Sequence, residues 1–302
     1  MRNYDFVANL KRALIVSVAI MVLGLVVNVI FGTEMDLTFK GGTLIRYSYE
    51  TAPDLNALEA TAKETLGGTP QISLDDINST KVVSVTLSGT VTTEQQQKFA
   101  DAIEKNYKDN KMVQFQSNTL PAAMGAKFFS RCLIALAFAA GLLVVYVALR
   151  FRNIGGIPAA VSALIALVHD LLIVYFTFVI FRIELNNNFV AVMLTILGYS
   201  LNDTIVIFDR IRTLRKRSDA NLSDVVNASL HEVLRRTIVT TLTTCVAISV
   251  VLVVALVMHV DSIISFALPM LLGAISGSYS SIFLSGPIWV RWMERRAAKG
   301  KK

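Results

Sequence analysis

Residues 189–208 read FVAVMLTILGYSLNDTIVIF, an apolar run that contains one carboxyl group, that of Asp203. A bilayer core of about 30 Å needs about 20 helical residues at a rise of 1.5 Å each, so this run is long enough to cross. A charge inside that core costs several kcal/mol (about 2.5 to 3.5 on insertion scales), and such carboxyls usually belong to ion or proton paths. The run therefore predicts a membrane helix with a functional acid. A structural aspartate capped by arginine or backbone groups is the alternative.

The composition also indicates that lipid surrounds much of the chain. Of 302 residues, 54% are hydrophobic and 17% are charged, whereas soluble domains carry about 25% charged residues. Five further runs approach or exceed the length of a span, at residues 13–31, 132–149, 157–181, 237–258 and 263–290. We expect a polytopic α-helical membrane protein with six transmembrane helices.

Lysine and arginine gather at alternate ends of the predicted helices, which indicates an orientation. With the N-terminus in the cytoplasm, the basic groups at 11–12, 150–152, 210–217 and 291–302 all lie inside. The positive-inside rule then places both termini in the cytoplasm. The first helix, long and without a cleavage pattern, is expected to be a retained anchor. The net charge of +7 is read as an orientation signal and an attraction to anionic lipid, with no nucleic acid as partner.

A polar segment at residues 32–128 lies between the first two helices and would face the outside. Alternating patterns predict strands at 43–49, 81–88 and 112–116, a weaker strand at 71–73, and helices at 54–66 and 93–107. This β-α-β-β-α-β order is typical of a ferredoxin-like α+β domain. Its expected role is contact with other protein, and a plain spacer is the alternative.

The remaining domain boundaries follow from these patterns. Residues 1–31 form the N-terminus and first helix, 129–290 the other five helices, and 291–302 a basic cytoplasmic tail. Within the cytoplasmic amphipathic segment at about 210–236, residues 219–234 have an apolar edge beside charged neighbours. This edge predicts a helix that lies along the membrane surface.

Sequence signals of catalysis are missing from the chain. Cys132 and Cys245 fall in different predicted spans without metal or disulfide spacing, and no Walker loop, HExxH pair or Ser/His/Asp arrangement occurs. We expect neither an enzyme nor a metal site nor a bound cofactor.

Several polar residues bear on Asp203. Asp170 is a second intramembrane carboxyl, and Arg236 either snorkels to the headgroups or answers a carboxylate on a facing helix. The threonine row that includes Thr240 either lines this face or bonds back to its own helix. The candidate proton relay consists of Asp203, Asp170, Arg236, Asn202, Tyr199 and Thr240, with Asp209 and Arg210 at its cytoplasmic mouth.

The last predicted span carries four small residues at intervals of four, Gly273, Gly277, Ser281 and Ser285. Small residues at this spacing let two helix backbones approach closely. We expect this face to contact another helix bundle.

Three motifs resemble those of the SecD/SecF family, relatives of the resistance-nodulation-division transporters. Residues 198–212, GYSLNDTIVIFDRIR, are similar to the signature of SecF chains. Residues 227–229 with the threonines after Arg236 resemble a second signature, and residues 39–43, FKGGT, resemble the motif after the first helix. Thr38 stands where the family often has aspartate, although Asp36 is close enough to substitute.

The resemblance implies a subunit of an accessory complex for protein export in the bacterial cytoplasmic membrane, driven by the proton motive force. The implied partners are SecD, the SecYEG channel, YajC, YidC and the unfolded exported polypeptide, besides membrane lipids. Whether the coupling ion is H⁺ or Na⁺ stays open at this stage. Two other functions also stay open: a half-transporter for lipid or small molecules, and a non-transporting scaffold of the translocon.

Overall fold

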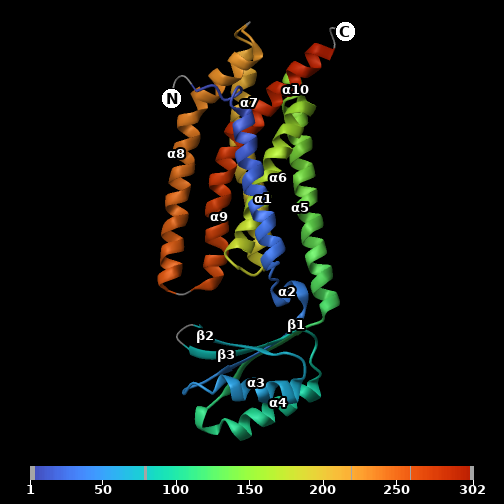
Figure 1. Cartoon of the computed structure of the whole chain (residues 1–302), viewed down its shortest axis with the longest axis vertical. Helices are drawn as coiled ribbons and strands as arrows, with labels where there is room; N and C mark the ends of the chain where they lie inside the picture. Colours follow the sequence, from blue (N-terminus) through green and yellow to red (C-terminus); the bar gives the residue numbers. More distant parts are fainter. Residues whose placement is uncertain (1–3, 78–79, 219, 259, 300–302) are drawn as a thin grey trace. The chain divides into compact units, whose positions relative to one another are not determined.

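The computed structural model describes residues 4–77, 80–218, 220–258 and 260–299. Contacts divide the chain into two compact units. One unit is helical and consists of Met1–Glu34 and Ile134–Lys302, and the other, Met35–Leu133, contains the sheet (Figure 1).

Within the described residues, six helices are long and apolar enough to cross a membrane, which confirms the predicted architecture. The first five are α1 (Leu10–Phe31), α5 (Ala122–Arg150), α6 (Gly156–Ile180), α7 (Asn187–Arg215) and α8 (Leu222–Val257). The sixth is composite and consists of α9 (Asp261–Ser280), a π-helical turn η3 (Ser281–Ser285) and α10 (Gly286–Lys299). A short helical turn, η2 (Arg152–Ile154), joins α5 to α6.

Burial separates central helices from peripheral ones. About half of the most apolar window is buried in α6, α7 and the composite helix (56%, 50% and 50%), against 11%, 6% and 6% in α1, α5 and α8. In Figure 1, α5 and α8 lie at the two edges of the helical unit. The centre of the bundle is therefore the contact between α6, α7 and α9, and any site built there is protected from lipid.

The predicted surface helix at 219–234 is not a separate element. Helix α8 begins at Leu222 and continues without interruption through the fifth span for 36 residues, while Asp219 lies outside the described residues. The apolar edge belongs to the protein core, where Val226 and Leu230 are fully buried in one cluster with Phe208 and Trp289. Protein, rather than the membrane surface, therefore covers the edge that the sequence analysis assigned to lipid.

The small-residue face also packs inside the chain instead of against another bundle. A Cβ atom on Gly273 would lie 2.8 Å from side-chain atoms of Ile196 and Val174, and one on Gly277 would lie 2.9 Å from the Ser200 Cβ. Ser281 and Ser285 are completely buried. Helix α9 and the turn η3 use these positions to pack inside the helical unit, so the expectation of an intermolecular contact was wrong.

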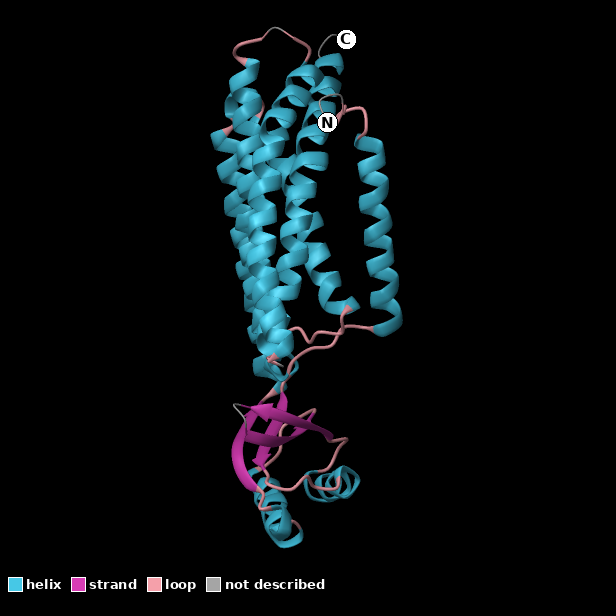
Figure 2. Ribbon diagram, turned by 90° about the vertical axis from the view of Figure 1, so that its left-hand side faces the viewer, coloured by secondary structure: helices cyan, strands magenta, loops and turns pink. Residues whose placement is uncertain are grey.

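The second unit has the predicted ferredoxin-like order. Its elements are α2 (Leu37–Lys40), β1 (Gly42–Ser48), α3 (Leu55–Leu66), β2 (Gln71–Ile77), β3 (Thr80–Leu87), α4 (Thr93–Asn106), η1 (Lys108–Asn110) and β4 (Val113–Leu120). The strands form one antiparallel sheet in the order β2-β3-β1-β4. Helices α3 and α4 lie on one face of it (Figure 2). The core between them and the sheet includes fully buried Leu58, Val83 and Phe99.

Local signals explain the ends of these elements. The Asp54 carboxylate accepts from the Asn56 amide at 3.0 Å and so caps α3, and Thr92 forms a capping box with Gln95 at the start of α4. The short helix α2 was not predicted. Its N-cap is Asp36, whose carboxylate accepts from the Thr38 amide at 2.8 Å, so this acid is engaged in helix capping.

The double glycine of the FKGGT motif meets a backbone requirement. Gly41 and Gly42 have φ angles of 74° and 150°, values that only glycine adopts readily. A Cβ atom on Gly41 would also lie 2.4 Å from the Cα of Ala122. The motif therefore brings the start of β1 against the start of α5.

Candidate functional site

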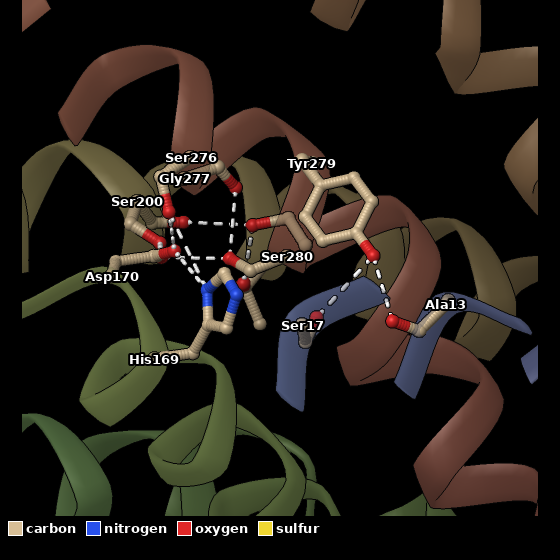
Figure 3. Close-up of polar contacts among 11 residues, drawn as sticks. Ala13, Ser17, His169, Asp170, Ser200, Ser276, Gly277, Tyr279 and Ser280 are labelled. Atoms are coloured by element: carbon tan, nitrogen blue, oxygen red, sulfur yellow. Dashed lines mark hydrogen bonds and ion pairs between the residues drawn. The ribbon is translucent and has the colours of Figure 1, made fainter. Parts of the chain in front are cut away.

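The centre of the helical unit holds a carboxylate surrounded by hydroxyl groups (Figure 3). Asp170 on α6 is completely buried. Ser276 donates to Asp170 Oδ1 at 2.6 Å, and Ser200 and Ser280 donate to Oδ2 at 2.6 and 2.7 Å. Because Ser200 lies on α7 and the other two serines lie on α9, one carboxyl group connects the three central helices.

The neighbouring His169 extends this network towards α1. Its Nδ1 lies 3.0 Å from Asp170 Oδ1, and its Nε2 is buried and has no hydrogen-bond partner among the described residues. The imidazole lies against the Tyr279 ring, 5.9 Å between centroids. The Tyr279 hydroxyl donates to the Ala13 carbonyl at 2.9 Å and lies 3.3 Å from Ser17 Oγ (Figure 3). The network therefore reaches a fourth helix.

The arrangement around Asp170 depends on the protonation state of this group. An ionised carboxylate accepts only and has about four lone-pair sites, and Asp170 has four neighbouring polar partners. Protonation would turn one oxygen into a donor, so at least one serine would have to find another acceptor. A single proton can thus change hydrogen bonds between three helices.

Asp203 lies three residues after Ser200 and therefore on an adjacent part of the same α7 surface. Its side chain is 8% exposed and its Oδ2 has no hydrogen-bond partner among the described residues. Among the residues that the structure describes, Asp203 and Arg236 do not form the ion pair that the sequence analysis considered. Arg236 is exposed on α8, in agreement with the snorkelling alternative.

The other relay candidates do not gather around Asp203. Thr240 donates to the carbonyls of Arg236 and Thr237 at 2.9 and 3.0 Å, so it bonds back to its own helix. Asn202 is exposed and Tyr199 is half-buried, and among the residues that the structure describes neither is hydrogen-bonded to Asp203. The polar cluster that the structure forms is therefore different from the predicted relay and consists of Asp170 and the three serines that donate to it.

Asp209 and Arg210, the predicted mouth of the path, form ion pairs near the C-terminal end of α7, the helix end that lies on the side of both termini. Asp209 pairs with Arg150 of α5 at 3.1 Å and with Arg212 at 2.7 Å. Arg210 pairs with Glu232 of α8. These contacts join α7 to α5 and to α8.

The segment before α1 is fastened to α8 at the same end. Asn227 Oδ1 accepts from the Phe6 amide at 2.9 Å, and Asn227 Nδ2 donates to Asp5 at 2.8 Å. Hydrogen bonds from the Ala8 amide and from Asn227 lower the pKa of Asp5. The asparagine of the second sequence motif thus positions the N-terminal segment.

Sequence reasoning assigned none of the three serines to Asp170. Residues 276–281, SGSYSS, place Ser276 and Ser280 at an i, i+4 spacing, which puts both on one helix face. That spacing was the available signal, because hydroxyls repeated on one face of an apolar helix can serve a buried charge. The described residues contain no group of three or more His, Cys, Asp or Glu side chains placed to hold a metal ion.

Comparisons with known proteins show the family to which the chain belongs. The model of the family "Protein export membrane protein SecD/SecF, C-terminal" matches residues 98–295. The protein translocase subunit SecF of Alicyclobacillus acidocaldarius is 34% identical over 99% of this chain and 97% of its own length. The subunit SecDF of Bacillus subtilis is 29% identical over 99% of this chain and 39% of its own length.

Solved structures show the same relationship. SecDF of Thermus thermophilus, a translocon-associated membrane protein, has a TM-score of 0.76 at 25% identity over 96% of this chain, which spans 39% of that longer chain. A SecDF crystal structure in a super-membrane-facing form gives a TM-score of 0.64 over 99% of this chain. The chain belongs to the SecD/SecF family of protein-export membrane proteins.

Proposed function

We propose that this chain is a translocase subunit that works with a SecD chain beside the SecYEG channel and uses the proton motive force to assist polypeptide export. The names of its relatives support an accessory role in Sec protein export. In the SecDF proteins the matching region occupies about 40% of a longer chain, which supports SecD as the partner. Both termini are proposed to be cytoplasmic, in the cell membrane of a bacterium.

The observation that carries the coupling proposal is the pair of carboxyls on adjacent central helices. Asp203 is nearly buried and lacks a partner at Oδ2, whereas Asp170 is buried with every oxygen engaged. One charge that crosses 100 mV releases about 2.3 kcal/mol, enough to exchange one or two hydrogen bonds of about 1 kcal/mol each. We propose that Asp203 exchanges the proton, and that the Asp170 network transmits the change to α6, α7 and α9.

The test is Asp203→Asn, with Asp224→Asn as the matched control. Asp224→Asn makes the same chemical change at an exposed position of α8 that belongs neither to the candidate relay nor to its mouth. Export into inverted membrane vesicles is measured with and without an imposed proton gradient, with channel and motor protein constant. We expect Asp203→Asn to remove the gradient stimulation and Asp224→Asn to retain it.

Assembly must be measured beside export, by recovery of SecD with the tagged chain. An assembled Asp203→Asn complex that still responds fully to the gradient would refute the coupling proposal and favour the scaffold function. A response that follows a sodium gradient and survives a protonophore would replace H⁺ with Na⁺ as the coupling ion.

A further inference from the structure

A cavity of about 1030 Å³ opens between α1 and α10 at the end of the helical unit that carries the termini. In Figure 1, α10 runs obliquely to α1. The apolar wall of the cavity includes Leu10, Leu14 and Ile288, and its rim includes the basic residues Lys11, Arg291, Arg295 and Arg296. The cavity thus combines an apolar interior with a strongly basic edge.

The basic rim lacks matching negative charge. Its one acidic residue, Glu294, accepts from Ser223 Oγ at 2.6 Å and lies 3.7 Å from Arg291. Lys11, Arg295 and Arg296 form no ion pair with the residues that the structure describes. The arginines that contact Asp209 and Glu232 are paired. Arg215, Lys216 and Arg217 also form no ion pair with the described residues, but they do not line the cavity.

The apolar interior continues along α1. Leu14 also begins a second hollow of about 670 Å³, lined by apolar side chains of α1 as far as Val26. Twelve residues of helix correspond to about 18 Å, and one leaflet of a 30 Å core is about 15 Å deep. The apolar path through the two hollows is therefore about as long as one acyl chain. The basic residues lie at the end of this path near Lys11.

We propose that this cavity binds one anionic phospholipid of the adjacent leaflet. Lys11, Arg295 and Arg296 hold the headgroup phosphate, and the acyl chain lies along α1 from Leu14 to Val26. A polybasic site at the membrane surface prefers anionic over zwitterionic lipid, and an arginine fork matches the geometry of phosphate. The site is independent of the proton-coupling function, because none of its residues contacts Asp170 or Asp203.

The chain contains its own reporter of occupancy. Of its two tryptophans, Trp292 lines the cavity and Trp289 is completely buried in the bundle. The full chain is placed in bilayers that contain phosphatidylglycerol or phosphatidylcholine with brominated acyl chains, and the quenching of tryptophan fluorescence gives the relative affinity for the two lipids. Trp292→Phe identifies the part of the signal that comes from the cavity.

The decisive comparison uses two variants that remove the same charge. One is Lys11→Gln, Arg295→Gln, Arg296→Gln, and the control is Arg215→Gln, Lys216→Gln, Arg217→Gln, three exposed residues near the end of α7. We expect the first triple to reduce the preference for phosphatidylglycerol about tenfold or more, and the control triple to leave it within about twofold. Arg296→Gln alone, at an exposed position, gives a smaller loss and needs no repacking.

Other outcomes would overturn the proposal. If both triple variants lost the preference for phosphatidylglycerol equally, the attraction would come from the net charge of the chain. If neither variant lost this preference, the basic rim would have no role in lipid binding. Displacement of the quenching lipid by inorganic phosphate would assign the site to a free anion. Displacement by a purified SecD chain would show that the face is a protein interface instead.

Discussion

The two intramembrane carboxyls differ in the number of hydrogen-bond donors that they accept from. Asp170 serves three serine donors from two other helices, whereas Asp203 leaves an oxygen without a partner. Asp170→Asn replaces an acceptor with an amide donor, so a buried serine loses its acceptor, at about 1 to 3 kcal/mol. We expect Asp170→Asn to lower the free energy of unfolding by that amount, and Asp203→Asn to change it by less than about 1 kcal/mol.

Unfolding of both purified variants in the same detergent checks this order. A matched third variant, Ser276→Ala, removes one donor and should fall between them. If Asp203→Asn were the more destabilising change, Asp203 would have partners that the described residues do not show.

At the scale of single residues, the sequence identifies the two buried aspartates but does not identify the groups that they contact. A carboxyl inside an apolar run is conspicuous because lipid tolerates it poorly, so Asp170 and Asp203 are identifiable directly. Which hydroxyls surround Asp170 depends on how α7 and α9 pack around α6, and this is a tertiary property. The choice between the two alternatives for Arg236 has the same cause, because spacing along one helix does not determine where a long flexible side chain ends.

At the scale of elements, the glycines of α9 determine how closely the central helices approach. A Cβ atom on Gly277 would lie 2.9 Å from Ser200 Cβ, whereas one on Gly141 of α5 would meet nothing within 4 Å. We expect Gly277→Ala to destabilise the bundle by about 1 to 3 kcal/mol through overpacking. Gly141→Ala should be neutral or stabilising by up to about 1 kcal/mol, because alanine is the better helix former.

Thermal unfolding of the two variants side by side tests the packing assignment. Equal stability would contradict the packing of the small-residue face against α7 and would favour the contact with another helix bundle that the sequence analysis expected. Because Ser200 also donates to Asp170, Gly277→Ala should shift this serine and weaken the gradient response more than Gly141→Ala does.

The elements themselves were largely predictable. Local patterns located the strands and helices of the sheet unit: Asp54 and Thr92 cap the helices that were predicted at 54–66 and 93–107. The error at residues 219–234 has a physical cause. An amphipathic pattern indicates that an apolar edge is covered, and the same pattern arises whether lipid or protein covers it.

The whole molecule has peripheral helices with little protein around them. In α1, α5 and α8 only 11%, 6% and 6% of the apolar window is buried, so lipid or a further chain covers the rest. Composition predicted the number of spans correctly, because span length is fixed by the bilayer. The assembly partner could not be read from composition, since lipid-facing and protein-facing membrane surfaces are similarly apolar.

Orientation is a property of the whole molecule and follows from the distribution of positive charge. Single cysteines are introduced at exposed positions after both native cysteines are replaced: Ala60 and Glu104 in the sheet unit, and Asn153, Arg217 and Ala298 in the helical unit. A membrane-impermeant thiol reagent added to intact cells should label the first two and spare the other three, because lysine and arginine near helix ends remain in the cytoplasm. Labelling after membrane disruption is the control, and all five positions should then react. Protection of Ala60 together with labelling of Asn153 in intact cells would invert the topology, and would place the proposed lipid site in the outer leaflet.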